Sequence, residues 1–186
     1  MIDAVYRNFC DQAVAYLQPT TPTTRTVDLT RPDIPVITDL GNGLLATYVV
    51  VQDDKLRYVQ QCHLVEAGLT QAQLHHQAVV NLTLLTKTKT ALIQPHGDVF
   101  VVLCGGSFEA SLILIDELWE NTLNHFAPNG FIAAFPCRDI LAFCDAGSAT
   151  GIEQLRQIIT RAEEGDHHIT PVPYYRSEAT WRSYAN

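Results

Sequence analysis

Residues Thr90 to Ser111, TALIQPHGDVFVVLCGGSFEAS, carry the strongest local signals of the fold class. Two apolar runs, TALIQ and DVFVVLC, surround the turn sequence Pro95-His96-Gly97, and together they predict a β-hairpin. Two glycines and a serine follow, and beyond them apolar residues recur at helical spacing. Strands that arrive in adjacent pairs and are then separated by helices favour an α+β fold with a mainly antiparallel sheet.

The rest of the chain has the same order of paired strands and intervening helices. LLATYVVVQ and KLRYVQQ predict a second hairpin around Asp53-Asp54, and FIAAF and ILAFC predict two further strands. Helical spacing of apolar residues predicts helices at residues 2–17, 70–86, 107–126 and 152–165. Apolar residues cover much of the circumference of the 107–126 helix, so we expect one strongly buried central helix packed on the sheet.

The length of 186 residues fits a single domain whose core needs neither a metal nor disulfides. Thr70 and Gln73 have the spacing of a capping box at the start of their helix. HITPVPYY and TWRSY predict edge strands at the end of the chain. Residues 18–38 are rich in Pro and Thr, so we expect an extended connector between the first helix, residues 1–17, and an α+β core at residues 39–186.

The formal net charge of −8 argues against nucleic-acid binding, because phosphate contacts need clustered Lys and Arg. An acidic balance suits solubility or a basic protein partner. No apolar run reaches the roughly 18 residues that a membrane span needs, so we expect no membrane association. Five cysteines without a C-x-x-C pair, and an amino terminus unlike a secretion signal, predict reduced thiols and a cytoplasmic location.

Gly105-Gly106-Ser107 allows two interpretations. Backbone N–H groups at a helix start attract anions, and glycine lets a ligand come close, so these residues are a candidate ligand-binding site. The G-x-G-x-x-G and P-loop motifs are absent, however, and Glu109 stands where a G-x-S-x-G motif needs its second glycine. We favour the structural interpretation, in which the glycines allow a tight turn and Ser107 caps the helix.

A second candidate ligand-binding turn is Pro136-Cys137-Arg138-Asp139. Arg138 and Asp139 could hold a carboxylate ligand or act as an acid–base pair, and Cys137 could be a nucleophile if Arg138 stabilised its thiolate. A turn in which the Asp bonds its own backbone explains the same residues. An enzyme built on both candidates requires that the two turns flank one cleft.

The seven histidines predict neither a metal site nor a cofactor. His75-His76 and His167-His168 are adjacent pairs, and neighbouring residues on a helix do not converge on one ion. The H-x-x-x-H and H-E-x-x-H patterns are absent, and His63, His96 and His125 are scattered. We therefore expect no metal ligand and no cofactor.

The end of the chain combines aromatic residues with arginines. This is the composition of protein contact surfaces, and it makes the following residues candidates for protein contact: Tyr174, Tyr175, Arg176, Trp181 and Arg182. The alternative is that the same residues, with Tyr184, cover an edge of the sheet.

The region from about Leu44 to Asp145 resembles the YtpQ-like family of uncharacterised bacterial proteins. Its matching residues are Leu74, Ala78, Asn81, Leu82, Glu109-Ala110-Ser111, Pro136, Asp139, Leu141 and Asp145. The first 40 residues differ from that pattern. The resemblance implies a soluble cytoplasmic α+β protein, and it supplies no catalytic residue.

The leading hypothesis is a non-enzymatic binding or regulatory protein that works through protein contacts. The acidic balance, the missing catalytic motifs and the aromatic end of the chain favour it. The rival hypothesis is an enzyme with an unfamiliar site at Gly105–Ser107 and Arg138-Asp139. The sequence leaves the oligomeric state open.

Overall fold

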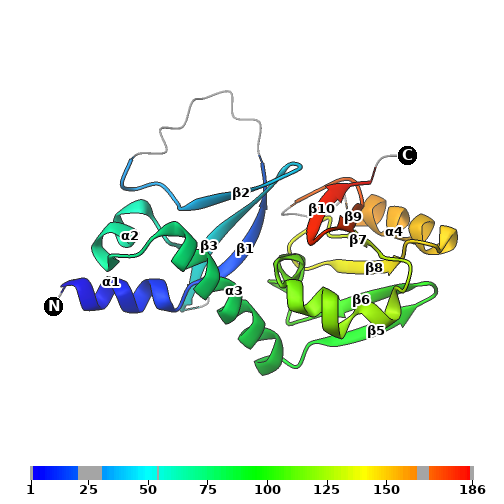
Figure 1. Ribbon diagram of the computed structural model, residues 1–186, viewed down its shortest axis with the longest axis horizontal. Coiled ribbons are helices and arrows are strands. Elements are labelled where there is room, and N and C mark those ends of the chain that lie inside the picture. Colours follow the sequence, from blue (N-terminus) through cyan, green and yellow to red (C-terminus); the bar gives the residue numbers. More distant parts are fainter. Residues whose placement is uncertain (1, 21–30, 54, 163–167, 185–186) are drawn as a thin grey trace. The chain divides into compact units, whose positions relative to one another are not determined.

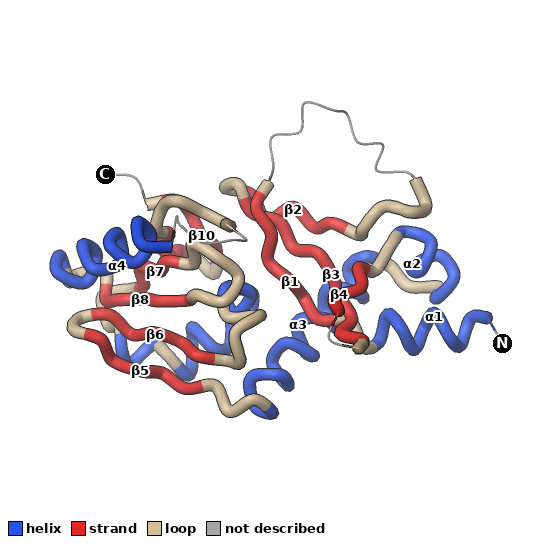
Figure 2. The backbone as a smooth tube through the Cα atoms, turned by 180° about the vertical axis from the view of Figure 1, so that it is seen from behind, coloured by secondary structure: helices blue, strands red, loops and turns tan. Residues whose placement is uncertain are grey.

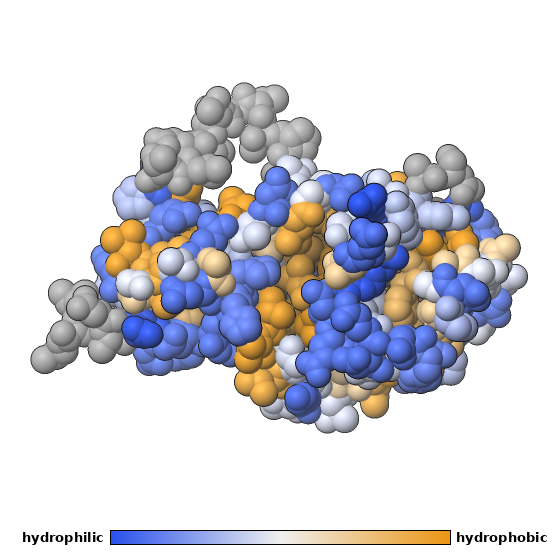
Figure 3. Space-filling model, viewed as in Figure 1, coloured by the Kyte–Doolittle hydropathy of each residue, from blue (hydrophilic) through white to orange (hydrophobic). Residues whose placement is uncertain are grey.

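The computed structural model describes residues 2–20, 31–53, 55–162 and 168–184, and it contains helices together with antiparallel sheets (Figure 1). The predicted α+β class is therefore confirmed. The chain divides into two compact units, Met1–Leu85 and Thr86–Asn186, where the sequence predicted one domain. Hydrophilic side chains cover much of each unit on the face seen in Figure 3. No helix in the described ranges is both long and apolar enough to cross a membrane.

The first unit is built around one long strand. Its elements are α1 (Ile2–Asp11), β1 (Val14–Pro19), β2 (Ile37–Gly41), β3 (Leu44–Gln52), β4 (Lys55–Tyr58), α2 (Gln61–Ala67) and α3 (Gln71–Thr88), whose last turn lies in the second unit. Strand β3 is central in a four-stranded antiparallel sheet, with β1 on one side and with β2 and β4 on the other. The β3–β4 pair is the predicted hairpin.

The predicted helix over residues 2–17 is wrong in its second half. Helix α1 ends at Asp11, and the chain enters β1, where Tyr16 pairs with Thr47 of β3. Tyr16 is 4% exposed and Leu17 is 1% exposed, so both faces of β1 are buried. Pairing with β3 therefore outweighs the helical spacing of these residues. Of the predicted connector, residues 21–30 lie outside the described part of the chain.

The helices of the first unit lie on one face of its sheet (Figures 1 and 2). The hydroxyl of Tyr48 on β3 bonds to Nδ1 of His75 on α3 at 2.9 Å. The side-chain amide of Asn81 on α3 donates to the carbonyls of Asp11 and Ala13, each at 2.8 Å. These bonds hold α3 to the sheet and to the end of α1.

The starts of two helices show why one was predicted and the other was missed. The capping box of α3 is confirmed, because the Gln73 amide donates to Thr70 Oγ1 at 3.2 Å and the Thr70 amide to Gln73 Oε1 at 2.9 Å. Helix α2 was not predicted. Its own capping box uses a histidine: the Gln60 amide donates to His63 Nδ1 at 3.0 Å. The usual pattern requires Glu or Gln at that position.

The second unit is built on a six-stranded antiparallel sheet in the order β10-β9-β7-β8-β6-β5. Its elements are β5 (Leu92–His96), β6 (Val99–Leu103), β7 (Phe131–Ala134), β8 (Leu141–Asp145), α4 (Ala149–Ala162), β9 (Tyr174–Ser177) and β10 (Thr180–Ser183). The predicted hairpin is β5–β6, and FIAAF and ILAFC form β7 and β8. Strand β10 is an edge strand as predicted, whereas β9 is internal, because Tyr175 pairs with Ile132 of β7.

The two faces of this sheet are covered differently. Helix α4 packs on one face through Ile152, Leu155 and Ile159 (Figure 2). Gly151 permits the close approach, because a Cβ atom there would lie 2.7 Å from the Cβ of Cys144. Residues 104–130 cover the opposite face, and the ring of their buried Trp119 contacts two strand phenylalanines.

Residues 107–126 do not form one helix, so that prediction is wrong in form. They form a 3₁₀ turn at Ala110–Leu114, a π-helical turn at Leu118–Thr122 and a 3₁₀ turn at Asn124–Phe126. The predicted burial is observed, since Leu112, Trp119 and Leu123 are 0% exposed. The indole N–H of Trp119 donates to the Leu112 carbonyl at 3.0 Å, a carbonyl that a regular α-helix gives to the backbone four residues on.

Candidate functional site

The double-glycine corner already contains an anion supplied by the chain. Gly105 and Gly106 both have positive φ, which turns the chain sharply after β6. The carboxylate of Glu109, a residue only 2% exposed, accepts hydrogen bonds from the backbone amides of Cys104 at 2.7 Å, Gly106 at 2.7 Å and Phe108 at 3.1 Å. The amides that would attract a ligand are therefore bonded to the protein itself.

Ser107 does not have the predicted capping role. The first regular turn after the corner begins at Ala110, and its preceding residue is Glu109. It is the Glu109 carboxylate, with its two oxygens, that accepts the backbone amides of the corner. A serine hydroxyl cannot accept from so many donors at once with comparable strength.

The two candidate turns are adjacent in the second unit. The backbone amide of Ala110 donates to the carbonyl of Arg138 at 3.1 Å. Burial and the carboxylate of the exposed Asp139 raise the pKa of the Cys137 thiol to about 11. Cys137 is therefore a neutral thiol near pH 7, and a nucleophile requires the thiolate. The adjacency of the two turns meets one condition of the enzyme hypothesis. The corner amides, however, are already bonded to Glu109, and Cys137 is not a thiolate near pH 7.

Of the five residues of the predicted protein contact surface, two are buried, two are half-buried and one is exposed. Tyr174 is 4% exposed and Trp181 is 7% exposed, and the Trp181 indole N–H donates to the carbonyl of Ile113 at 3.0 Å. Tyr175 packs against the core on the α4 face. Arg182 is exposed, and Arg176 is half-buried. The burial of Tyr174 and Trp181 favours the alternative interpretation, in which this group covers an edge of the sheet.

Arg176, the remaining member of that group, is also enclosed. Its side chain is 7% exposed, and its Nη2 atom contacts the carboxylates of Asp116 at 2.8 Å and Glu120 at 3.2 Å. Its guanidinium lies over the Trp181 ring, 5.7 Å from the ring centre. These contacts bind β9 to the 104–130 segment.

The histidines are dispersed. Among the residues whose positions are described, no three His, Cys, Asp or Glu side chains lie close enough to hold a metal ion. His75 bonds to Tyr48, and burial lowers the pKa of His75. His167 lies outside the described residues, while His96 and His168 are exposed.

A pocket that the sequence did not predict lies in the first unit between α1, α2, β3 and β4. Its volume is about 510 Å³, within the roughly 300–1,000 Å³ range of ligand pockets. Aromatic rings, one guanidinium and side-chain amides line it: Tyr6, Asn8, Phe9, Gln12, Gln52, Arg57 and His63. We call it the aromatic–arginine pocket.

The rings of this pocket are packed against one another. Tyr6 stacks on His63 with ring centres 5.6 Å apart, and Phe9 meets His63 edge-on at 4.9 Å. The guanidinium of Arg57 lies over the Phe9 ring, 5.5 Å from its centre, and donates to Gln52 Oε1 at 2.9 Å. Rings and cation thus form one preorganised surface.

His63 is held neutral and in one tautomer. Its Nδ1 accepts the Gln60 amide, so the ring hydrogen is on Nε2 in the neutral form. Burial lowers the pKa of His63, and the nearby Arg57 cation lowers it further, although Glu66 opposes the shift. Arg57 is therefore the cation of this pocket near pH 7.

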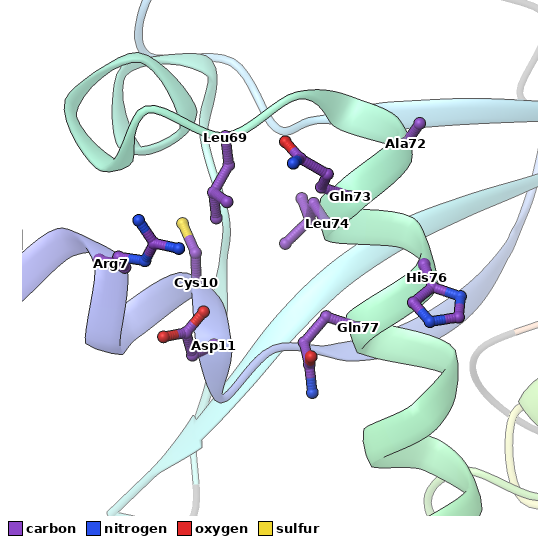
Figure 4. Close-up of a pocket in the computed structure, with 9 residues that line it drawn as sticks. All are labelled: Arg7, Cys10, Asp11, Leu69, Ala72, Gln73, Leu74, His76 and Gln77. Carbon is purple, nitrogen blue, oxygen red and sulfur yellow. The ribbon is translucent and has the colours of Figure 1, made fainter.

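A second pocket, of about 430 Å³, lies in the same unit between α1 and α3 (Figure 4). Arg7, Cys10 and Asp11 project from α1 on one side of it. Burial, with smaller contributions from Asp11 and Cys62, raises the pKa of the Cys10 thiol to about 11. Two of the polar side chains opposite are used in the fold, since Gln73 belongs to the capping box and Gln77 donates to Asn81. This pocket therefore offers less binding chemistry than the aromatic–arginine pocket.

The sequence contains only part of the signal for the aromatic–arginine pocket. Tyr6 and Phe9 are three residues apart in α1, and this spacing assigned them to a core-facing stripe. Arg57 and His63 are about fifty residues away, and they reach the same place only because β4 pairs with β3 and α2 packs on α1.

The residues that carry the YtpQ-like resemblance have structural roles. Leu74, Ala78 and Leu82 form the buried face of α3. Glu109 fills the double-glycine corner, and the Asp145 carboxylate accepts backbone amides of the adjacent loops. Comparisons of the chain with protein-family models, with curated proteins and with solved structures found no match.

Proposed function

We propose that this chain is a non-enzymatic protein-binding or regulatory module whose contact surface is the aromatic–arginine pocket of the first unit. The observation that carries this proposal is the exposed Arg57 guanidinium lying over Phe9, beside the half-buried rings of Tyr6 and His63. Tyr, Phe and Arg are the residue types enriched at protein interfaces and at their energetic centres. The site thus has the composition that the end of the chain was expected to supply.

The state of the cysteines supports a non-catalytic function in a reducing compartment. Five cysteines are free thiols. Burial raises the pKa of Cys10 and Cys137 to about 11 and that of Cys144 to about 12, and it also raises the pKa of Cys104. Such thiols are poor nucleophiles near pH 7. A cytoplasmic location, and kinship with the YtpQ-like family, are parts of this proposal.

An affinity capture with matched variants tests the proposal. The tagged chain, its Phe9→Ser and Arg57→Gln variants, and a control variant of the exposed Arg161, Arg161→Gln, are incubated with lysate from the source cells at low and high salt. We expect one partner that the wild type and the control retain and that both pocket variants lose. Recovery of no partner at any salt concentration, or equal recovery by every variant, overturns the proposal.

The enzyme hypothesis is the alternative, and the bond between Ala110 and Arg138 favours it by placing both turns together. It requires a ligand to replace the Glu109 carboxylate at the Gly106 amide. A crystal grown in phosphate decides between the two. An anion bonded to the Gly106 amide supports an enzyme site, and the Glu109 carboxylate in that place rejects it.

A further inference from the structure

Several described arginines, among them Arg7 and Arg57, make no ion pair, and Arg57 combines this unpaired charge with a position over an aromatic ring. Arg31, Arg156 and Arg176 each contact a carboxylate. Within residues 2–20, 31–53, 55–162 and 168–184, Arg57 has no ion pair, and the hydrogen bond of its Nη1 atom goes to the neutral Gln52. A guanidinium carries five N–H donors, so most of its capacity for a carboxylate remains.

The rings provide the second half of the recognition surface. Tyr6, Phe9 and His63 present their faces and edges within one pocket of about 510 Å³. A further aromatic ring gains offset or edge-to-face contacts there, worth about 0.5–1.5 kcal/mol beyond area burial. The guanidinium is already oriented over Phe9, so little ordering cost is added when a ligand binds.

The amides at the rim match a peptide backbone. Gln12 Nε2 donates to Asn8 Oδ1 at 3.0 Å, which joins a side chain of α1 to that of the residue after its end. A primary amide has two N–H donors and one carbonyl acceptor, so this pair keeps an Asn8 donor and the Gln12 acceptor for a ligand. A peptide group offers the complementary acceptor and donor.

We propose that the aromatic–arginine pocket binds a segment of the partner protein in which an aromatic side chain stands beside a carboxylate. The ring packs against Tyr6 and Phe9, and the carboxylate pairs with Arg57. The charge complementarity is local: the whole chain is acidic, at −8, while this pocket presents a cation. The inference rests on the proposed function and specifies the partner's chemistry.

A random dodecapeptide phage library panned against the full chain tests this inference. We expect selected peptides to carry Phe, Tyr or Trp within two residues of Asp or Glu. Synthetic copies of these peptides should bind the Arg57→Gln variant at least about tenfold more weakly, about 1.4 kcal/mol. Arg57→Lys, which keeps the charge but loses the bidentate geometry, should give a smaller loss, and the Arg161→Gln control should give none.

Three results would overturn it: no enriched sequence, enrichment of basic peptides, or affinity that Arg57→Gln leaves unchanged. Circular dichroism of each variant checks that the fold is intact. If affinity capture recovers a partner that depends on Phe9 and Arg57 while the library selects other sequences, the proposed function stands and this inference fails.

Discussion

The two units each contain an arginine that lies over an aromatic ring, but one arginine is exposed and the side chain of the other is enclosed. In the first unit, Arg57 lies 5.5 Å from the centre of the Phe9 ring and is exposed. In the second unit, Arg176 lies 5.7 Å from the centre of the Trp181 ring, and its side chain is 7% exposed. The cation–ring geometry is nearly the same, so it does not decide which site is open.

The two arginines differ in the side chains that surround them. The Nη2 atom of Arg176 contacts two carboxylates of the 104–130 segment, so its charge is paired within its own unit, whereas its buried Nη1 atom has no hydrogen-bond partner among the described residues. Arg57 contacts the amide of Gln52, which is neutral. A charge that is paired within its own chain contributes to the fold, whereas a charge without an intramolecular carboxylate can pair with a carboxylate of another molecule. The two sites share the aromatic–arginine composition, and what differs between them is the presence of carboxylate partners for the arginine.

The largest expected effect on stability is that of Trp181→Ala, in the second unit. Trp181 is 7% exposed, contacts the ring of Trp119 and donates to the Ile113 carbonyl, so truncation leaves a cavity and an unpaired carbonyl. We expect the free energy of unfolding to fall by roughly 3–5 kcal/mol. Urea unfolding followed by Trp119 fluorescence measures it. A loss below about 1 kcal/mol would place Trp181 in a surface role, against the usual cost of emptying a core site.

Arg176→Ala should be the next largest, with a loss of roughly 1–3 kcal/mol. The matched variant Arg176→Met keeps most of the packing on Trp181 and removes the charge. Asp116 and Glu120 are 59% and 57% exposed in their side chains, so water can solvate them when the guanidinium is gone. We therefore expect Met to recover most of the loss in the same urea experiment. Equal losses for Ala and Met would show that the ion pairs, and not packing, hold this group together.

Local patterns predicted the elements whose signals lie within a few residues. The β5–β6 hairpin followed from Pro95-His96-Gly97, and the start of α3 from Thr70 and Gln73. Both depend on backbone bonds between near neighbours, which a sequence displays directly.

Elements that depend on distant pairing were missed. The spacing of Tyr16 and Leu17 fits a helix, and only pairing with β3 makes them a strand. Residues 107–126 were expected as one helix, but the side-chain bond from Trp119 to Leu112 belongs to a chain folded into short turns. Periodicity describes how much apolar surface a segment has, and it does not reveal what encloses that surface.

The candidate site shows the same limit. The double-glycine corner was correctly predicted to be a turn, yet its backbone amides are accepted by the Glu109 carboxylate and not by the Ser107 hydroxyl. The aromatic–arginine pocket was missed because Phe9 and Arg57 are separated by most of the first unit. A sequence lists donors and acceptors, and only the fold shows which of them are already paired.

A smaller effect on stability is expected from the protonation of His63 in the aromatic–arginine pocket. Burial lowers the pKa of His63, so the folded state holds the neutral ring, whereas the unfolded chain takes a proton near pH 6.5. The stabilisation is fully present above the unfolded-state pKa, and it is lost as the pH falls from that value through the lower folded-state pKa. His63→Gln keeps an acceptor for the Gln60 amide and removes the titration.

We therefore expect the stability of wild-type α2 to decrease between pH 7.5 and pH 5.5, and that of His63→Gln to decrease less. Hydrogen exchange of α2 amides, corrected for intrinsic rates, measures this in the first unit, where the chain has no tryptophan. The same decrease in both proteins would mean that His63 contributes nothing to the acid sensitivity of this unit.

The smallest expected effect on stability is that of Arg57→Gln, and it is the one on which the comparison depends. An exposed cation over a ring contributes about 0.5–1 kcal/mol, and the bond to Gln52 is made in water-accessible surroundings. The glutamine keeps part of the aliphatic stem and an amide group but removes the cation, so the free energy of unfolding of the first unit should fall by no more than about 0.5–1 kcal/mol. Urea unfolding followed by far-ultraviolet circular dichroism measures it. If Arg57→Gln instead costs as much as Arg176→Ala, then Arg57 is a structural arginine like its counterpart, its charge serves the fold, and the reason for assigning a partner to this pocket is removed.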